Sequence, residues 1–219
     1  MNSDTLRQSV AGPAGAIECA VDAPPAASAG SVLALRGTVV VCHPHPQHGG
    51  TMDNKVVQTV ARAFVQLGWR SVRFNFRGVG ASAGAWGDGI GEVDDALAVI
   101  AAFRAPPEEP AQLFMLAGFS FGGYVAAAAA ARLPEADKPQ RLVLVGPSTQ
   151  KQQVAAVPAN TLVIHGETDD VVPLAATLDW ARPQSLPVLV FPGVGHFFHG
   201  QLGLLKNVLV QELMPRQVL

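Results

Sequence analysis

The feature that most constrains the fold of this chain is the pentapeptide Gly118–Gly122, which has the pattern G-x-S-x-G. The apolar run Leu113–Ala117 comes directly before it, and an alanine-rich segment follows it. This order predicts a buried strand, a tight turn and a helix, a context in which the serine is held in a strained backbone conformation. Ser120 is therefore a candidate nucleophile; the alternative is an ordinary glycine-rich turn between a strand and a helix.

The composition of the chain fits a compact enzyme. Its 219 residues are 49% apolar and 15% charged, enough for a substantial core in one domain over residues 1–219. A net charge of -2 gives no reason to expect nucleic acid or a membrane as a partner, and it does not define an oligomeric state. The two cysteines make no disulfide framework, and residues 1–7 lack the layout of a signal peptide. No apolar stretch is long enough to span a bilayer, so we expect a cytoplasmic protein.

Strands and helices alternate along the chain. Apolar runs predict strands at 16–21, near 32–35, 38–42, 70–76, 113–119, 142–145, 161–164 and 188–191. Helical spacing and capping signals predict helices at 54–67, 92–103, from 121 to about 133, from about 173, and after 198. Loops are expected at 23–31 and 77–89, and the segment 105–107 is expected to end the helix at 92–103. This alternation indicates an α/β fold with a mainly parallel central sheet and helices on both faces.

A serine hydroxyl is a poor nucleophile without a base, and the base needs an orienting acid. In an open α/β sheet these groups come from the carboxyl ends of neighbouring strands. Two predicted strand ends supply them. The segment His165–Pro173 contains two aspartates, and Gly193–His199 contains two histidines.

The resulting chain order of serine, acid and histidine resembles the α/β-hydrolase superfamily from Val39 onward. The glycine-rich loop Arg77–Ser82 adds to this resemblance. More closely, the segments His43–Pro46 (H-P-H-P) and Gly49–Lys55 (G-G-T-M-D-N-K) look like a group of small bacterial hydrolases related to dienelactone hydrolases. The resemblance implies an α/β-hydrolase fold and a serine hydrolase mechanism.

Carried over to this sequence, the resemblance makes Ser120 the nucleophile, His196 the general base and Asp169 the orienting acid. The superfamily pattern G-x-x-D places the acid three residues after the glycine, here Gly166, which favours Asp169 over its neighbour. We interpret that neighbour, Asp170, as facing solvent or capping the next helix.

The choice of base rests on position in the loop. His196 directly follows Gly195 after the strand, whereas His199 is expected at the start of the last helix. His199 is therefore interpreted as a surface histidine or one that supports the site. His165, at a strand end beside the acid, is interpreted as structural.

A tetrahedral intermediate needs two N–H donors close to the serine. The backbone N–H of Phe121, at the start of a helix, is expected to be one of them. The second is expected from the loop after the strand at 38–42, where the prolines at 44 and 46 have no N–H. His45 is the favoured donor, and the alternatives are His43 and Gln47.

Histidines at positions 43, 45 and 48 also raise the question of a metal site, because zinc binds imidazole. No carboxylate or cysteine has convincing ligand spacing near them, so no metal is expected. The glycine-rich segments do not form a phosphate-binding or dinucleotide-binding pattern, and no cofactor is expected.

About fifteen residues separate the strand at 142–145 from the next one, too few for a lid of several helices. We therefore expect an open site for a small-molecule acyl substrate, with His43, Trp86 and Phe197 as candidate substrate contacts. The predicted function is a serine hydrolase that cleaves small carboxylic esters. A thioesterase, a dienelactone or C–C bond hydrolase, a perhydrolase, a peptidase and a non-catalytic binding module remain as alternatives.

Overall fold

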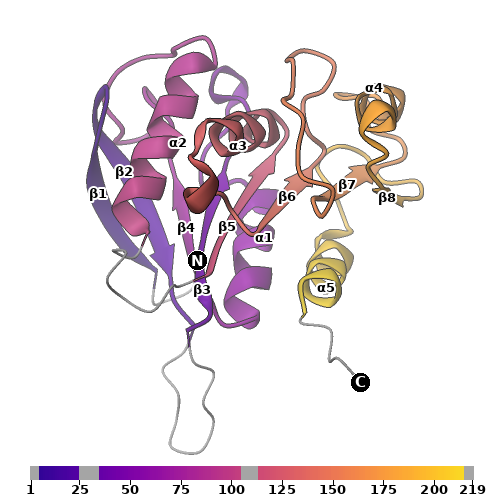
Figure 1. The fold of residues 1–219 in the computed structure, drawn as a ribbon, viewed down its shortest axis with the longest axis horizontal. Helices are drawn as coiled ribbons and strands as arrows, with labels where there is room; N and C mark the ends of the chain where they lie inside the picture. Colours follow the sequence, from indigo (N-terminus) through magenta and orange to yellow (C-terminus); the bar gives the residue numbers. More distant parts are fainter. Residues whose placement is uncertain (1–4, 25–34, 105–112, 215–219) are drawn as a thin grey trace, which may run out of the picture.

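The computed structural model describes residues 5–24, 35–104 and 113–214. In these ranges an eight-stranded sheet has the order β1-β2-β4-β3-β5-β6-β7-β8, with helices on both faces (Figure 1). The neighbouring strands from β4 to β8 are parallel, which confirms the predicted fold class. The strands are β1 Leu6–Gly12, β2 Gly15–Asp22, β3 Gly37–Cys42, β4 Trp69–Phe74, β5 Leu113–Phe119, β6 Arg141–Val145, β7 Leu162–Gly166 and β8 Val188–Phe191.

The first strand, β1, lies outside every range predicted as a strand. It pairs with β2 in an antiparallel hairpin in which Val10 lies opposite Ile17, and β2 in turn runs antiparallel to β4. Most residues of β1 are exposed, so its sequence carries no apolar alternation that would reveal it. The hairpin extends the sheet at one edge, on the β4 side of the central strands.

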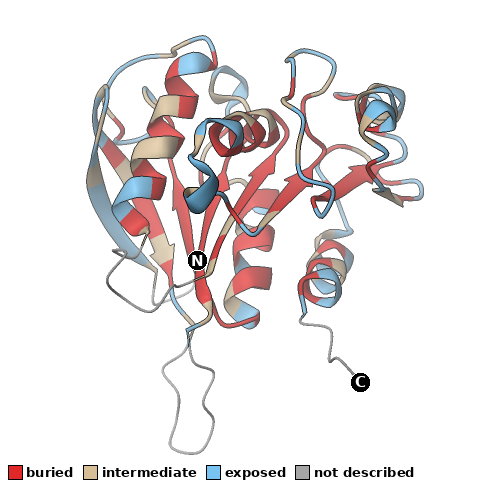
Figure 2. Ribbon diagram, in the orientation of Figure 1, coloured by how far each residue is buried: buried red, intermediate tan, exposed pale blue. Residues whose placement is uncertain are grey.

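The central strand β3 is buried along its whole length, as its uninterrupted β-branched sequence predicts (Figure 2). Val39 and Val41 face one hydrophobic cluster, whereas Val40 and Cys42 face the other. Fully burying a valine stabilises a fold by about 1.5–3 kcal/mol relative to leaving it exposed. Strand β3 therefore ties the two layers of helices to the sheet.

Two pairs of helices cover the two faces of the sheet. Helices α1 and α5 pack on one face, and α2 and α3 pack on the other, while α4 lies against β7. The helices are α1 Lys55–Gln66, α2 Ile90–Phe103, α3 Phe121–Arg132, α4 Leu174–Ala181 and α5 Leu202–Leu213, with 3-10 turns at Pro46–His48, Glu135–Asp137 and Arg182–Gln184. The alanines of α3 belong to its buried face, which lets this helix lie close to the central strands.

Local signals set the ends of α1. The Asn54 side chain accepts hydrogen bonds from the N–H groups of Val56 at 2.9 Å and Val57 at 3.4 Å. After the helix, Gly68 adopts a positive φ of 85°, which glycine tolerates best. The helix therefore falls where the sequence predicts it.

The segment 146–161, between β6 and β7, contains neither a helix nor a strand, in line with the expected lack of a lid. The predictions for 25–34 and 105–107 lie outside the described residues, and Leu35 is not in a strand. Within the described ranges, no helix is both long enough and apolar enough to cross a membrane.

Candidate active site

The turn between β5 and α3 holds Ser120 in an unusual conformation, with φ at 56° and ψ at -120°. Such strain costs about 1–3 kcal/mol and persists only where the surroundings enforce it. The Ser120 N–H donates to the Val145 carbonyl at 2.9 Å. A Cβ atom at Gly118 would lie 2.1 Å from the Gly122 carbonyl oxygen, and one at Gly122 would lie 2.3 Å from the Cys42 carbonyl oxygen. Both flanking positions therefore require glycine.

The loops after β7 and β8 bring an acid and a histidine to this serine. The Nε2 atom of His196 lies 3.0 Å from the Oγ atom of Ser120. On the other side of the ring, Nδ1 lies 2.6 Å from Oδ2 of Asp169. All three side chains are buried. Since a carboxylate only accepts hydrogen bonds, Nδ1 carries the ring hydrogen and Nε2 is left to accept from the serine hydroxyl.

The Asp169 carboxylate is fixed by its own loop. Its Oδ1 atom accepts hydrogen bonds from the N–H groups of Val171 at 2.9 Å and Val172 at 2.7 Å. Burial raises the pKa of Asp169, but the hydrogen bonds from His196 and Val172 outweigh it, and the net pKa is below the ordinary value. The carboxylate is therefore ionised at neutral pH. Asp170 is exposed and makes no capping bond to α4, so it faces solvent.

The two other histidines of these loops have different surroundings. His165 is fully buried, and its Nε2 atom bonds to the Val172 carbonyl at 2.8 Å and lies 3.4 Å from Oδ2 of Asp169. Burial lowers the pKa of His165, so its ring is neutral behind the acid. His199 is exposed and contacts the ring of Phe197. The structure thus brings His196, and neither of these two, to Ser120.

The two expected oxyanion donors lie on elements that contact each other. Helix α3 begins at Phe121, whose N–H is one of the donors that a helix leaves without an internal partner. The ring of His45 packs against that of Phe121, with centroids 4.9 Å apart. Within the described part of the chain, the His45 N–H has no acceptor.

His43 is fully buried, and both of its ring nitrogens are bonded inside the protein. Nδ1 lies 2.6 Å from the Pro44 carbonyl oxygen, and Nε2 accepts from the Phe76 N–H at 3.1 Å. His43 is thus not available for the substrate contact that the sequence suggests. His43 cannot contact substrate because it has no exposed surface. The sequence does not reveal that a residue at the end of a strand is buried.

The other two candidate substrate contacts pack against different members of the site. The ring of Trp86 is partly buried and packs on the rings of His45 and Phe121, with centroids 4.6 Å and 5.4 Å away. Phe197 is 42% exposed, and its ring stands edge-on to that of His196 at 5.0 Å. Trp86 therefore contacts the two residues expected to supply the oxyanion donors, and Phe197 contacts the candidate base.

Two buried carboxylates that the sequence analysis does not single out support the Trp86 loop. Asp95 bonds the Arg77 guanidinium at 2.7 Å and 3.0 Å, and Glu92 accepts from the N–H groups of Gly87 and Gly89. Both acids lie on α2 and are fully buried. Their spacing on one helix face, next to a glycine-rich loop, is the signal that could have indicated this role.

A second polar network supports the loop that precedes α1. The Arg73 guanidinium donates to the Met52 carbonyl at 2.9 Å and pairs with Asp22 and Asp53 at 3.0 Å each. The Asn75 side chain accepts from the Met52 N–H at 2.9 Å. The G-G-T-M-D-N-K segment therefore owes part of its pattern to anchoring on β4.

Comparison with known proteins identifies the family. Residues 34–160 match the model of the family described as serine aminopeptidase, S33. The chain belongs to this family of α/β-hydrolases. It is also 30% identical to an uncharacterized protein of Rickettsia prowazekii over 172 residues, which cover 73% of this chain and 71% of that protein.

Two solved structures resemble this α/β-hydrolase along nearly its whole length. One is a serine hydrolase without a lid from Xanthomonas campestris, with 38% identity, a TM-score of 0.85, and coverage of 97% of this chain and 95% of that one. The other is an α/β serine hydrolase homologue from Coxiella burnetii, with 36% identity, a TM-score of 0.81, and coverage of 98% and 99%. The predicted superfamily and the lidless α/β-hydrolase fold are therefore confirmed.

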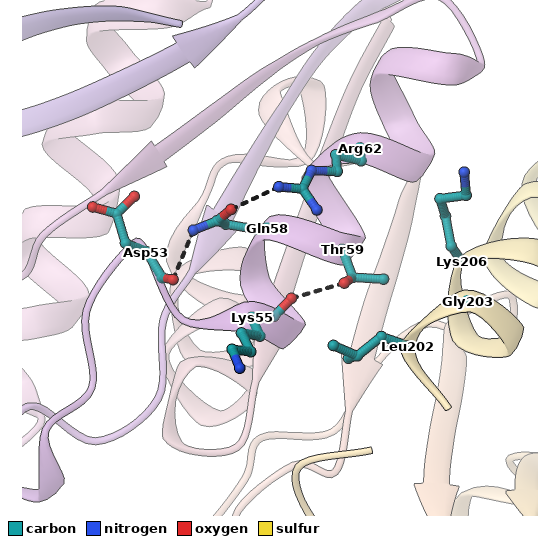
Figure 3. A pocket seen from close by; sticks show the side chains of 8 residues that line it. All are labelled: Asp53, Lys55, Gln58, Thr59, Arg62, Leu202, Gly203 and Lys206. Carbon is teal, nitrogen blue, oxygen red and sulfur yellow. Dashed lines mark hydrogen bonds between the residues drawn. The ribbon is translucent and has the colours of Figure 1, made fainter. Parts of the chain in front are cut away.

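Two cavities of this α/β-hydrolase differ in their relation to the serine. A cavity of about 360 Å³ adjoins His196 and Phe197 and is lined by the loops after β7 and β8. A larger one of about 570 Å³ lies between α1 and α5, where Gln58 bridges the Asp53 carbonyl and Arg62 (Figure 3). No member of the Ser120 site lines the larger cavity. In the described ranges, no group of three or more His, Cys, Asp or Glu side chains is arranged to hold a metal ion.

Proposed function

We propose that this hydrolase cleaves small carboxylic esters through an acyl-enzyme on Ser120. The observation that carries the proposal is the pair of hydrogen bonds that join Ser120 Oγ to His196 and His196 to Asp169, at 3.0 Å and 2.6 Å. These three groups supply a nucleophile, a base and an orienting acid in the chain order of α/β-hydrolases. Membership of the family supports hydrolysis, and the ester preference is our proposal.

In the first step, the Oγ atom of Ser120 attacks the ester carbonyl while His196 Nε2 takes the hydroxyl proton. The ring accepts this proton because Nδ1 already carries a hydrogen, which it donates to Asp169. The ionised carboxylate then stabilises the imidazolium that forms. Two backbone N–H groups hold Asp169 in place, so the ring does not need to reorient during the reaction.

The negative charge of the tetrahedral intermediate develops on the former carbonyl oxygen. We assign its stabilisation to the backbone N–H groups of Phe121 and His45. Losing one such donor typically lowers kcat by about 10²–10³-fold. His196 then returns its proton to the leaving alcohol, and afterwards it activates the water that hydrolyses the acyl-enzyme.

The open surroundings support a small substrate. The segment 146–161 forms no helical cover, and the similar serine hydrolase from Xanthomonas campestris has no lid. Trp86, which packs on Phe121, and Phe197, which packs on His196, are the apolar side chains we assign to substrate contact. Short acyl groups fit this arrangement better than long lipid chains, which need an enclosed apolar channel.

The family description favours a second candidate, hydrolysis of an aminoacyl amide or peptide. The same three side chains serve both reactions, because His196 protonates a leaving amine as it protonates a leaving alcohol. The two candidates differ in their preferred leaving group, which a substrate panel resolves.

The test is steady-state hydrolysis of matched acetyl, butyryl and octanoyl esters, the corresponding thioesters, a lactone and aminoacyl anilides. We expect the highest kcat/KM for short esters and no turnover by the Ser120→Ala variant. A preference for aminoacyl anilides would replace the first candidate by the second. Activity that persists in Ser120→Ala, at the wild-type rate, would refute both.

A further inference from the structure

His43 is the first residue after β3, and its ring has a defined tautomer. The Phe76 backbone N–H points at Nε2 at 3.1 Å, and an amide N–H can only donate. Nε2 is therefore the unprotonated nitrogen of the ring. It follows that Nδ1 carries the hydrogen and donates it to the Pro44 carbonyl oxygen, 2.6 Å away.

The surroundings keep this ring neutral and still. His43 has no exposed surface, and its ring packs against that of Phe76 with centroids 4.4 Å apart. Burial lowers the pKa of His43 to about 4, well below the ordinary value of 6.5. With both nitrogens engaged, the ring has no free atom for proton transfer or for a substrate.

The hydrogen bond to Pro44 fixes the direction of the next N–H group. The Pro44 carbonyl and the His45 N–H belong to one peptide unit, and the described residues contain no cis peptide bond. In a planar trans unit the two groups point in opposite directions. The His45 carbonyl is itself held, because it accepts from the N–H groups of His48 at 3.1 Å and Gly50 at 3.0 Å. The His45 N–H is thus turned away from the His43 ring.

This N–H belongs to a turn that contacts the start of α3. A Cβ atom added at Gly122 would lie 2.5 Å from the His43 carbonyl oxygen, so the two backbones are in direct contact. The turn leaves the His45 amide without an acceptor in the described chain. Its neighbours at positions 44 and 46 are prolines and have no N–H to offer.

We propose that His43 is a positioning residue that orients the Pro44–His45 peptide so that its N–H faces the oxyanion formed at Ser120. The inference rests on the proposed function. If the Pro44–His45 peptide were flipped, the Pro44 carbonyl oxygen would face the oxyanion in place of the His45 N–H. The carbonyl oxygen, which carries partial negative charge, would then repel the oxyanion. His43 acts through this peptide and touches neither substrate nor nucleophile.

Two amide variants separate the two hydrogen bonds of the ring. The side-chain amide of glutamine reaches the place of Nε2, so His43→Gln keeps an acceptor for the Phe76 N–H and loses the donor to Pro44. The shorter asparagine reaches the place of Nδ1, so His43→Asn keeps the donor to Pro44. In His43→Gln we expect kcat to fall by about 10²-fold, with KM little changed. In His43→Asn we expect kcat to fall by only about tenfold.

The affinity for an inhibitor that forms a tetrahedral adduct is a second measurement, and a loss of stability alone does not change it. The affinity for an alkyl boronic acid should fall in parallel with kcat/KM across the His43 variants, because the adduct oxygen occupies the oxyanion site. Val40→Ala, in the strand β3 that precedes His43, is the matched control. It opens a cavity in the core but leaves both nitrogens of His43 bonded, and we expect its kcat within about twofold of wild type.

The outcomes are distinct. A folded His43→Gln variant with wild-type kcat and boronate affinity overturns the inference while the proposed function stands. If neither variant folds, nitrogen NMR of the wild-type ring and the His45 amide decides. We expect a proton on Nδ1 alone from pH 6 to 8 and a shifted His45 amide proton in the boronate adduct; a proton on Nε2 or an unshifted amide refutes the inference. Wild-type protein without Ser120-dependent hydrolysis refutes the proposed function and, with it, this role.

Discussion

Replacing Asp169 by asparagine should trap His196 in the wrong tautomer. In the wild type, Oδ1 of Asp169 accepts from the N–H groups of Val171 and Val172, and Oδ2 faces His196 Nδ1. Two N–H donors require an oxygen opposite them, so the asparagine oxygen takes the Oδ1 position. Its NH₂ group then points at Nδ1 of His196 and donates to it.

The magnitude follows from this geometry. A ring that accepts at Nδ1 carries its hydrogen on Nε2, and that nitrogen no longer accepts the Ser120 proton. In proteases with the same three groups, the equivalent change lowers kcat by about 10⁴-fold, which corresponds to about 5 kcal/mol of transition-state stabilisation. We expect a loss of this size in Asp169→Asn. The N–H groups of Val171 and Val172 must face the oxygen of the asparagine amide, so the amide cannot flip to present that oxygen to His196.

The assay is hydrolysis of a short p-nitrophenyl ester, with thermal unfolding measured on each variant. Asp170→Asn is the matched control, since this neighbouring carboxylate is exposed, and its kcat should stay within about twofold of wild type. A folded Asp169→Asn protein that keeps more than about a tenth of wild-type kcat would show that the tautomer reasoning is wrong.

Three further predictions concern stability and the rim of the site. Because burial holds the folded pKa of His43 at about 4 against 6.5 in the unfolded chain, its contribution is present above pH 6.5 and is lost as pH falls toward 4. This contribution amounts to about 3 kcal/mol. Between these pH values, the free energy of unfolding measured with a denaturant should therefore change less with pH in His43→Asn than in wild type. An equal pH dependence in the two proteins would contradict this. Gly122→Ala should destabilise the protein by about 1–3 kcal/mol or prevent folding, since its Cβ meets the Cys42 carbonyl at 2.3 Å. Gly203→Ala, in open space on α5, should stabilise by about 0.5–1 kcal/mol in the same melts; a destabilised Gly203→Ala or an unaffected Gly122→Ala would count against the packing argument. Trp86→Ala should raise KM for short esters several-fold with a smaller effect on kcat, and an unchanged KM would remove Trp86 from the substrate site.

Most of the fold could be predicted because its elements carry strong local signals. Strand β3 is a β-branched run, α1 has an asparagine cap and a closing glycine, and the turn at Ser120 has glycines at both positions where a Cβ atom would collide. The hairpin strand β1 escaped prediction because its exposed residues show no apolar periodicity. Such a strand is defined by pairing with β2, which is a contact between chain segments and not a property of one of them.

The site also contains residues that could be predicted from the sequence and residues that could not. The resemblance to α/β-hydrolases predicts Ser120, Asp169 and His196 as one site, and the structure brings these three side chains within hydrogen-bonding distance. The surroundings of His43 could not be predicted, because its bond to the Phe76 amide joins residues 33 positions apart. Burial and distant pairing, which decide between a histidine that contacts substrate and one that shapes the backbone, are absent from the local sequence.

Intact-mass labelling of the folded protein with a fluorophosphonate, followed by mapping of the modified residue, tests directly whether Ser120 is an activated nucleophile. We predict a single adduct on Ser120, absent from Ser120→Ala and formed far more slowly in His196→Ala. Folded wild-type protein that forms no adduct, or forms it at another residue, would contradict the claim that Ser120 is an activated nucleophile.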